Sequence, residues 1–234
     1  MRFPTRLLAA NAVFALLLWA GFWALVTAIT VFLGVTGRLT SSAWEVAAQA
    51  PRWYALFFGV ALVREFMPMY IAHGQTRRRF AVHGLITVAL FAPFLAALLV
   101  ISYLLEGVLY GLADWPHVLT RTHLFTSPTQ VPPIFAEYLV QFAAWIPAGA
   151  FMGAAFYRFR SNGLLSVPGG AALIIIAESS IDSKFWLPIV TNRLDIGLPD
   201  LPLTPFVAGV AVFLVGLLLT WSIIRDIPLR NQFA

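Results

Sequence analysis

The sequence contains no cysteine and very few charged residues. Without cysteine, the chain forms no disulfide and holds no metal ion through thiolates. Charged residues make up 11% of the 234 residues, whereas a soluble domain carries about 25%. Hydrophobic residues make up 60%, and the mean hydropathy is +0.85. A chain with so little polar surface cannot cover itself in water, so the composition excludes a soluble protein and predicts an integral membrane protein.

Sequence motifs of enzymes and of nucleic-acid-binding proteins are also missing. No glycine loop ends in lysine and serine or threonine, so no nucleotide chemistry is expected in this chain. The His-Glu-x-x-His zinc signature is absent, as is any Ser-His-Asp pattern. The net charge of +5 is not accompanied by a basic helix with an interleaved polar face. The chain is therefore predicted to be no enzyme and to bind no nucleic acid.

Long apolar runs are plentiful. A helix needs about 20 apolar residues to cross a hydrocarbon core roughly 30 Å thick. The sequence predicts an all-α, polytopic membrane helix bundle with six transmembrane helices in a single domain, 1–234. The predicted spans, of which the fifth is short, are Asn11–Val35, Arg52–Tyr70, Phe80–Leu105, Ile134–Phe156, Leu164–Ala177 and Leu203–Ile224. The first apolar run exceeds a signal peptide's roughly 7–15 residues, which indicates an uncleaved first span.

The distribution of arginine predicts the orientation of the bundle. An even number of spans places both termini on one side of the membrane. That side carries Arg2, Arg6, Arg77, Arg78, Arg79, Arg158, Arg160, Arg225 and Arg230. The other side carries Arg38, Arg52, Arg121, Lys184 and Arg193, spread over longer loops that include 106–133 and 179–202. The positive-inside rule therefore predicts a cell-membrane protein with both termini in the cytoplasm.

Titratable residues near the predicted outer boundary are interpreted as facing water. Glu137 begins the fourth span and Glu178 ends the fifth, where a carboxylate usually meets interfacial water. Binding of a cation or proton is the alternative. His117 and His123 have no nearby carboxylate in the sequence beyond Asp114. They make a weak metal site, and no bound metal is predicted.

Two other segments predict particular structures. Gly149 and Gly153 in "PAGAFMG" match the small-residue pattern of closely packed membrane helices. The contact lies either within one subunit, which is preferred, or at a dimer seam. The stretch "FWLPIV", Phe185–Val190, is too apolar for a plain solvated loop, and it predicts an interfacial or re-entrant helix.

The densest charge lies between the second and third spans, in "VREFMPMYIAHGQTRRRFAVHG". Arg64 and Glu65 fall near the cytoplasmic end of the second span, where Pro68 can kink the helix. Gly74 lets the backbone turn before the consecutive arginines Arg77–Arg79. In one interpretation the arginines are a topological anchor that binds anionic lipid headgroups. In the other they dock a cytoplasmic partner, because the chain has no other sizeable cytoplasmic surface.

The stretch "REFMP…IAHGQTRRRF" resembles the coupling region of the six-span permeases of ATP-binding-cassette type 2 exporters. Many of these carry a Gly-x-Thr-Arg-Arg-x-Phe-like stretch, which here reads Gly74, Gln75, Thr76, Arg77, Arg78, Arg79 and Phe80. The resemblance implies that residues 64–80 form a cytoplasmic helix that rests in a groove of a separate ATPase subunit. It implies that the segment around His73 to Phe80 receives the ATPase's motion, with Arg64 and Glu65 as a hinge pair. It also implies a second permease copy or a homologous permease, with ATP and Mg in the ATPase and no cofactor in this chain.

The leading hypothesis is therefore a permease subunit that exports an apolar or amphipathic substrate, because few charges line any span. The alternative is a non-transporting scaffold or accessory subunit that docks a cytoplasmic partner through the same arginines. A secondary transporter is disfavoured, since no charge falls at a span centre and no repeat relates the two halves. A membrane enzyme is disfavoured because no catalytic constellation is present.

Overall fold

The computed structural model describes residues 3–181 and 203–226, and all regular structure in these ranges is helical. The predicted helix at Phe185–Val190 lies outside the described residues. The elements are α1 (Phe3–Val35), α2 (Ala43–Ala47), α3 (Gln49–Ala61), the π-helix η1 (Leu62–Phe66), α4 (Met67–Ala72), α5 (Arg77–Ala113), α6 (Val131–Phe159), the 3₁₀-helix η2 (Arg160–Leu165), α7 (Ser166–Ser180) and α8 (Thr204–Ile224). The prediction of an all-α fold is confirmed.

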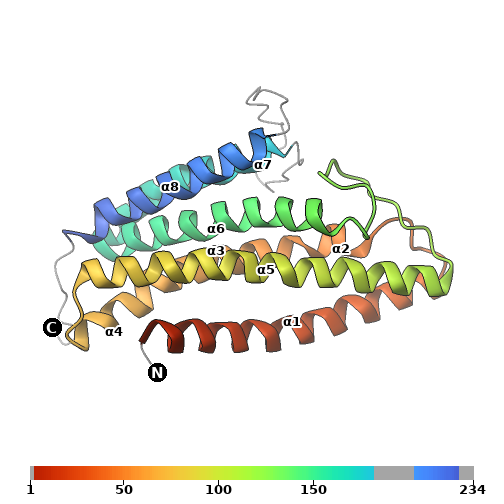
Figure 1. The fold of residues 1–234 in the computed structure, drawn as a ribbon, viewed down its shortest axis with the longest axis horizontal. Helices are drawn as coiled ribbons and strands as arrows, with labels where there is room; N and C mark the ends of the chain where they lie inside the picture. Colours follow the sequence, from red (N-terminus) through yellow and green to blue (C-terminus); the bar gives the residue numbers. More distant parts are fainter. Residues whose placement is uncertain (1–2, 182–202, 227–234) are drawn as a thin grey trace.

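Five helical stretches of the described chain are long and apolar enough to cross a membrane. One of them, Val131–Ser180, contains both α6 and α7, which run in opposite directions (Figure 1). With 15 residues, α7 is about 22 Å long, shorter than the hydrocarbon core of a bilayer. Multi-pass membrane character is thus supported by the helices, while a count of six crossings stays a prediction.

The long helices lie side by side, and α6 occupies the centre of the bundle (Figure 1). It packs against α3, α5, α7 and α8, so most of its side chains are buried. By contrast, α1 lies along the outside of the bundle next to α5. Its surface is apolar, and Leu17, for example, is 70% exposed. Such a surface is unfavourable in water and is suited to lipid.

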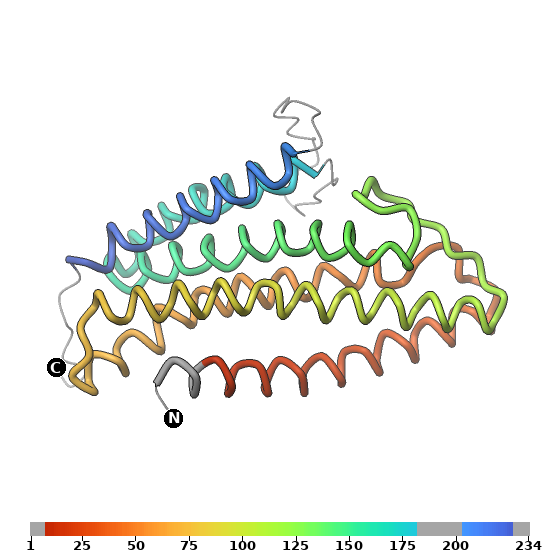
Figure 2. Tube along the Cα trace, in the orientation of Figure 1, coloured from red at the N-terminus to blue at the C-terminus, as the bar shows by residue number. Residues whose placement is uncertain are grey.

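The two ends of the bundle differ in the segments and side chains that they contain. Both ends can be followed in the chain trace of Figure 2. We call one the arginine end; it comprises the turn 73–76, Arg77–Arg79, η2 and the end of α8. The start of α1 lies near this end as well. We call the other the loop end; it comprises residues 36–48 and the segment 114–130 between α5 and α6.

The backbones of α3 and α6 touch through glycines. A Cβ atom added to Gly149 would lie 2.0 Å from the carbonyl oxygen of Leu56, and one added to Gly153 would lie 2.7 Å from that of Val60. From the other side, a Cβ on Gly59 would meet the carbonyl oxygen of Ile146 at 2.0 Å. The small-residue pattern therefore serves a contact within this chain, because α3 occupies the face that a second copy would need.

Candidate functional site

The predicted coupling segment begins as the end of a long helical stretch. Helix α3 runs into η1, which runs into α4 without a break. Pro68 lies in the first turn of α4, where its ring would clash in a regular α-helix with the carbonyl of Arg64, four residues earlier. The π-helical turn η1, which contains Arg64, interrupts the regular α-helical pattern at this point. Such single π-helical turns occur frequently at functional sites.

A tight turn then reverses the chain. The N–H group of Gln75 donates to the carbonyl of Tyr70 at 3.0 Å, and Gly74 has a φ of +72°. This left-handed conformation costs little for glycine and much for other residues. The hydroxyl of Thr76 caps α5 by accepting from the N–H group of Arg79 at 3.2 Å. Gly74 thus makes the turn that the sequence predicts, and Thr76 starts the next helix.

The resemblance to exporter permeases implies a cytoplasmic helix in this segment. The structure instead shows a six-residue α4 that continues α3 and η1, followed by the turn and by α5 itself. Arg77–Arg79 therefore lie on the first turn of α5 and not on a helix of their own. The physical reason is local: the cap at Thr76 starts a helix at once, leaving no room for a separate element.

The position of the three arginines is electrostatically unfavourable for α5. The N-terminus of a helix carries partial positive charge, and the first turn of α5 contains no acidic residue. The three side chains also have different surroundings. Arg77 donates to the backbone carbonyl of Arg225 at 3.1 Å, which joins α5 to the end of α8. Arg78 borders a groove, and Arg79 is close enough to Tyr70 and His83 to act on them electrostatically.

The remaining predicted docking residues do not all face outward. Arg64 and Glu65 are exposed on η1, and no ion pair joins these two described side chains. His73 is exposed, and its Nδ1 lies 2.7 Å from the carbonyl oxygen of Met69. Phe80, however, is buried and packs edge-to-face on Tyr70 with ring centroids 5.4 Å apart. Phe80 therefore fastens α4 to α5 and is not available to a partner.

A second concentration of polar residues lies in the interior towards the loop end. The prediction that Glu137 and Glu178 face water is wrong, because they are 0% and 1% exposed. Arg52, assigned to the outer side by the sequence, is 3% exposed. Its guanidinium lies 3.8 Å from the carboxylate of Glu178. The indole N–H of Trp145 donates to the same carboxylate at 2.9 Å.

The histidines of the 114–130 segment do have carboxylate partners, contrary to the prediction. Nδ1 of His123 lies 2.7 Å from Oε1 of Glu137, and its Nε2 lies 3.4 Å from Oε1 of Glu45. Nε2 of His117 lies 3.3 Å from Oε2 of Glu106. Even so, the described residues contain no group of three or more histidine, aspartate or glutamate side chains placed to hold a metal ion. The histidines connect the segment to the bundle.

The same carboxylates accept hydrogen bonds from the backbone. Glu106 accepts from the N–H groups of Ala43 and Trp44 at 2.8 and 3.1 Å. Glu45 accepts from the N–H groups of Thr120, at 2.9 Å, and of Arg121. Glu137 likewise accepts from the N–H group of Leu124 at 2.8 Å. Buried N–H groups without partners are costly, so these carboxylates hold the loop end together.

One polar side chain in this interior has no partner. Gln141 is 0% exposed, and neither its amide oxygen nor its amide nitrogen makes a hydrogen bond. It lies four residues from Glu137 and four from Trp145, so all three share one face of α6. Two polar residues at a spacing of four in an otherwise apolar span are the sequence signal that could have revealed this buried face.

Comparison of the chain with protein-family models, with curated proteins and with solved structures finds no match.

Proposed function

We propose that this chain is the membrane-spanning permease subunit of an ATP-binding-cassette exporter. The observation that supports it most is the placement of Arg78 and Arg79, exposed on the first turn of α5 beside a tight turn at the end of the bundle. These charges oppose the α5 dipole and pair with no carboxylate of the described chain, so anionic groups outside the chain would have to stabilise them. For Arg79, an acidic surface of a partner protein would do so.

The segment is built to transmit a push. The turn 73–76 joins α4 to α5, and Phe80 packs on Tyr70 between them. Force applied there would pass into α4 and reach η1, where the helical hydrogen-bond pattern changes. Beyond η1, α3 is held against α6 by the glycine contacts of Gly59, Gly149 and Gly153. Movement would therefore concentrate at η1, with the centre of the bundle as the fixed part.

The orientation and the partners follow from the same proposal. The arginine end faces the cytoplasm, as the positive-inside rule favours. A separate ATPase subunit docks on it and holds ATP and Mg, and a second permease copy or a homologous permease completes the transport path. The substrate is apolar or amphipathic. The buried charges Arg52 and Glu178 face each other within the subunit, which keeps them away from a path between subunits.

The test is purification of the tagged full chain in mild detergent, followed by mass spectrometry and an ATPase assay of the eluate. Arg79→Gln is compared with Arg160→Gln, which removes one exposed arginine from the same end. We expect an ATPase with a phosphate-binding loop to accompany the wild type and Arg160→Gln and to be depleted with Arg79→Gln. In vesicles, the complex with the wild type would couple ATP hydrolysis to export.

Three results would overturn the proposal. If the chain elutes without an ATPase, or if Arg79→Gln and Arg160→Gln retain it equally, the arginines do not couple this chain to ATP hydrolysis. If a cytoplasmic protein without ATPase activity is depleted by Arg79→Gln, the chain is a scaffold or accessory subunit that docks through the same arginines.

A further inference from the structure

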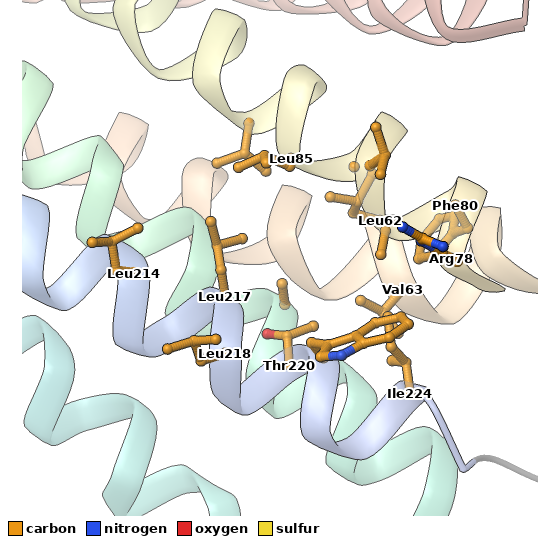
Figure 3. A pocket seen from close by; sticks show the side chains of 16 residues that line it. Leu62, Val63, Arg78, Phe80, Leu85, Leu214, Leu217, Leu218, Thr220 and Ile224 are labelled. Atoms are coloured by element: carbon orange, nitrogen blue, oxygen red, sulfur yellow. The ribbon is translucent and has the colours of Figure 1, made fainter.

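A groove opens between α5, η1 and α8 at the arginine end, with a volume of about 480 Å³. Figure 3 shows side chains from these elements around it, with Leu62 and Leu85 on one side and Leu214 and Leu218 on the other. Nearly all of its lining is apolar. The polar groups on lining residues are the guanidinium of Arg78, the indole N–H of Trp221 and the hydroxyl of Thr220. The hydroxyl of Thr220 donates to the carbonyl of Gly216 at 2.7 Å.

The charge lies at one end of the groove and the apolar lining extends from it. Arg78 is in the first turn of α5, and Val88, ten residues further along the same helix, also lines the groove. Ten helical residues span about 15 Å. That is half of a hydrocarbon core roughly 30 Å thick. The groove therefore has the length of one leaflet, with its positive charge where the headgroups of that leaflet would lie.

The occupant has to match both properties. Apolar surface between helices in a membrane is filled by lipid chains unless protein covers it, and α5 and α8 make few contacts with each other here. A guanidinium binds a phosphate through two parallel hydrogen bonds. Basic pockets between transmembrane helices on the cytoplasmic side bind anionic headgroups. A second protein copy would have to cover the apolar lining and also supply an anion for Arg78.

We propose that this groove binds one anionic phospholipid, with an acyl chain along Leu62, Leu85 and Leu218 and the phosphate on Arg78. The bound lipid would connect α5 to α8, which at this end are joined by the bond from Arg77 to the carbonyl of Arg225. The two exposed arginines then have different roles. Arg78 binds the lipid, while Arg79, on the side of Tyr70 and His83, binds the cytoplasmic partner of the proposed function.

The test is native mass spectrometry of the purified full chain, without any ATPase, so that its outcome is independent of the exporter proposal. Dioleoyl-phosphatidylglycerol and dioleoyl-phosphatidylcholine are added in equal amounts. We expect a preference for the anionic lipid in the wild type. Arg78→Gln should reduce that preference about fivefold, because it removes one arginine's attraction for the net negative charge that phosphatidylglycerol carries and zwitterionic phosphatidylcholine lacks. Arg160→Gln, which removes an exposed arginine away from the groove, should leave it unchanged.

A second pair of variants tests the apolar part. Leu218→Trp places a larger side chain in the groove and should lower the bound fraction of both lipids. Leu17→Trp makes the same change on the exposed surface of α1, outside the groove, and should have no effect. Both Leu218 and Leu17 are at least 65% exposed, so neither variant disturbs the core.

Four outcomes would overturn the lipid site. Three concern lipid binding: equal binding of both lipids by the wild type, equal results for Arg78→Gln and Arg160→Gln, or equal results for Leu218→Trp and Leu17→Trp. If Leu218→Trp instead converts a two-copy mass into a one-copy mass, the groove is an interface between subunits and not a lipid site.

Discussion

Charge is arranged differently at the two ends of this bundle. At the arginine end Arg78 and Arg79 are exposed and have no carboxylate partner in the described chain. In the interior towards the loop end, Arg52, Glu137 and Glu178 are at most 3% exposed and lie among other polar groups. Buried charges cost free energy unless they are paired. Removing one partner of a pair towards the loop end should therefore destabilise the fold. The exposed arginines contribute little to the fold, and their value depends on molecules outside it.

The largest loss of stability is expected from breaking the buried ion pair between Arg52 and Glu178. Arg52→Leu leaves the carboxylate of Glu178 buried without its cation, which should lower the free energy of unfolding by about 3–5 kcal/mol. Arg38→Leu, at the loop end but exposed, should change it little. Thermal unfolding in detergent measures both. The double variant Arg52→Leu/Glu178→Leu should be more stable than Arg52→Leu alone, and the opposite order would show that the two charges do not compensate each other.

A smaller loss is expected in the middle of the bundle, which joins the two ends. Gly149→Ala forces its new methyl group against the carbonyl oxygen of Leu56, 2.0 Å away in the present structure. Overpacking of this kind costs about 1–3 kcal/mol. Gly21→Ala is the matched control, because nothing lies within 4 Å of its added Cβ. Equal melting temperatures for the two variants would contradict the close contact between α3 and α6.

The next prediction concerns the attachment of the 114–130 segment. Glu137→Gln removes the charge that binds His123 and the N–H group of Leu124. A hydrogen bond to a charged group contributes about 1.5 kcal/mol or more. Amide exchange in the segment should therefore become about tenfold faster, as measured by mass spectrometry. Asp114→Asn is the control: Asp114 is exposed with a φ of +54°, a conformation that asparagine also adopts. Exchange that is unchanged by Glu137→Gln would show that the carboxylate does not hold the segment.

The smallest effect on stability is expected at the arginine end. Arg79→Gln removes a positive charge from the N-terminus of α5 and should change the free energy of unfolding by less than about 0.5 kcal/mol. The same thermal measurement used for Arg52→Leu checks it. Destabilisation as large as that of Arg52→Leu would remove the distinction between the two ends, because Arg79 would then be a structural residue.

Local features of the arginine end could be read from the residues. The sequence predicts that Gly74 turns the chain and that Pro68 disturbs the helix, and both properties depend on the backbone of a single residue. The burial of Phe80 could not be read in this way. A phenylalanine next to three arginines at a predicted helix start can face either way, and only its contact with Tyr70 on the preceding helix decides the direction.

The burial of the polar residues towards the loop end cannot be read from the sequence for a related reason. Glu106 binds the hydroxyl of Ser42, 64 residues earlier, and Glu45 binds Thr120, 75 residues later. Such partners become neighbours only when the helices pack, so no spacing in the sequence reveals them. Glu137 and Gln141, one helical turn apart, were the local signal available. This spacing indicates a polar face on α6, but it does not indicate which residues contact that face.

The sequence by itself determined that the chain is helical and apolar enough for a membrane. It also determined where the chain turns at Gly74 and which end carries the consecutive arginines. These properties depend on composition and on the backbone preferences of single residues. Only the tertiary structure decided that Arg52 and Glu178 face each other inside the bundle, that Gly149 meets Leu56, and that Arg78 borders an apolar groove. Contacts between helices depend on which faces pack against each other, and no single segment of the sequence determines that choice.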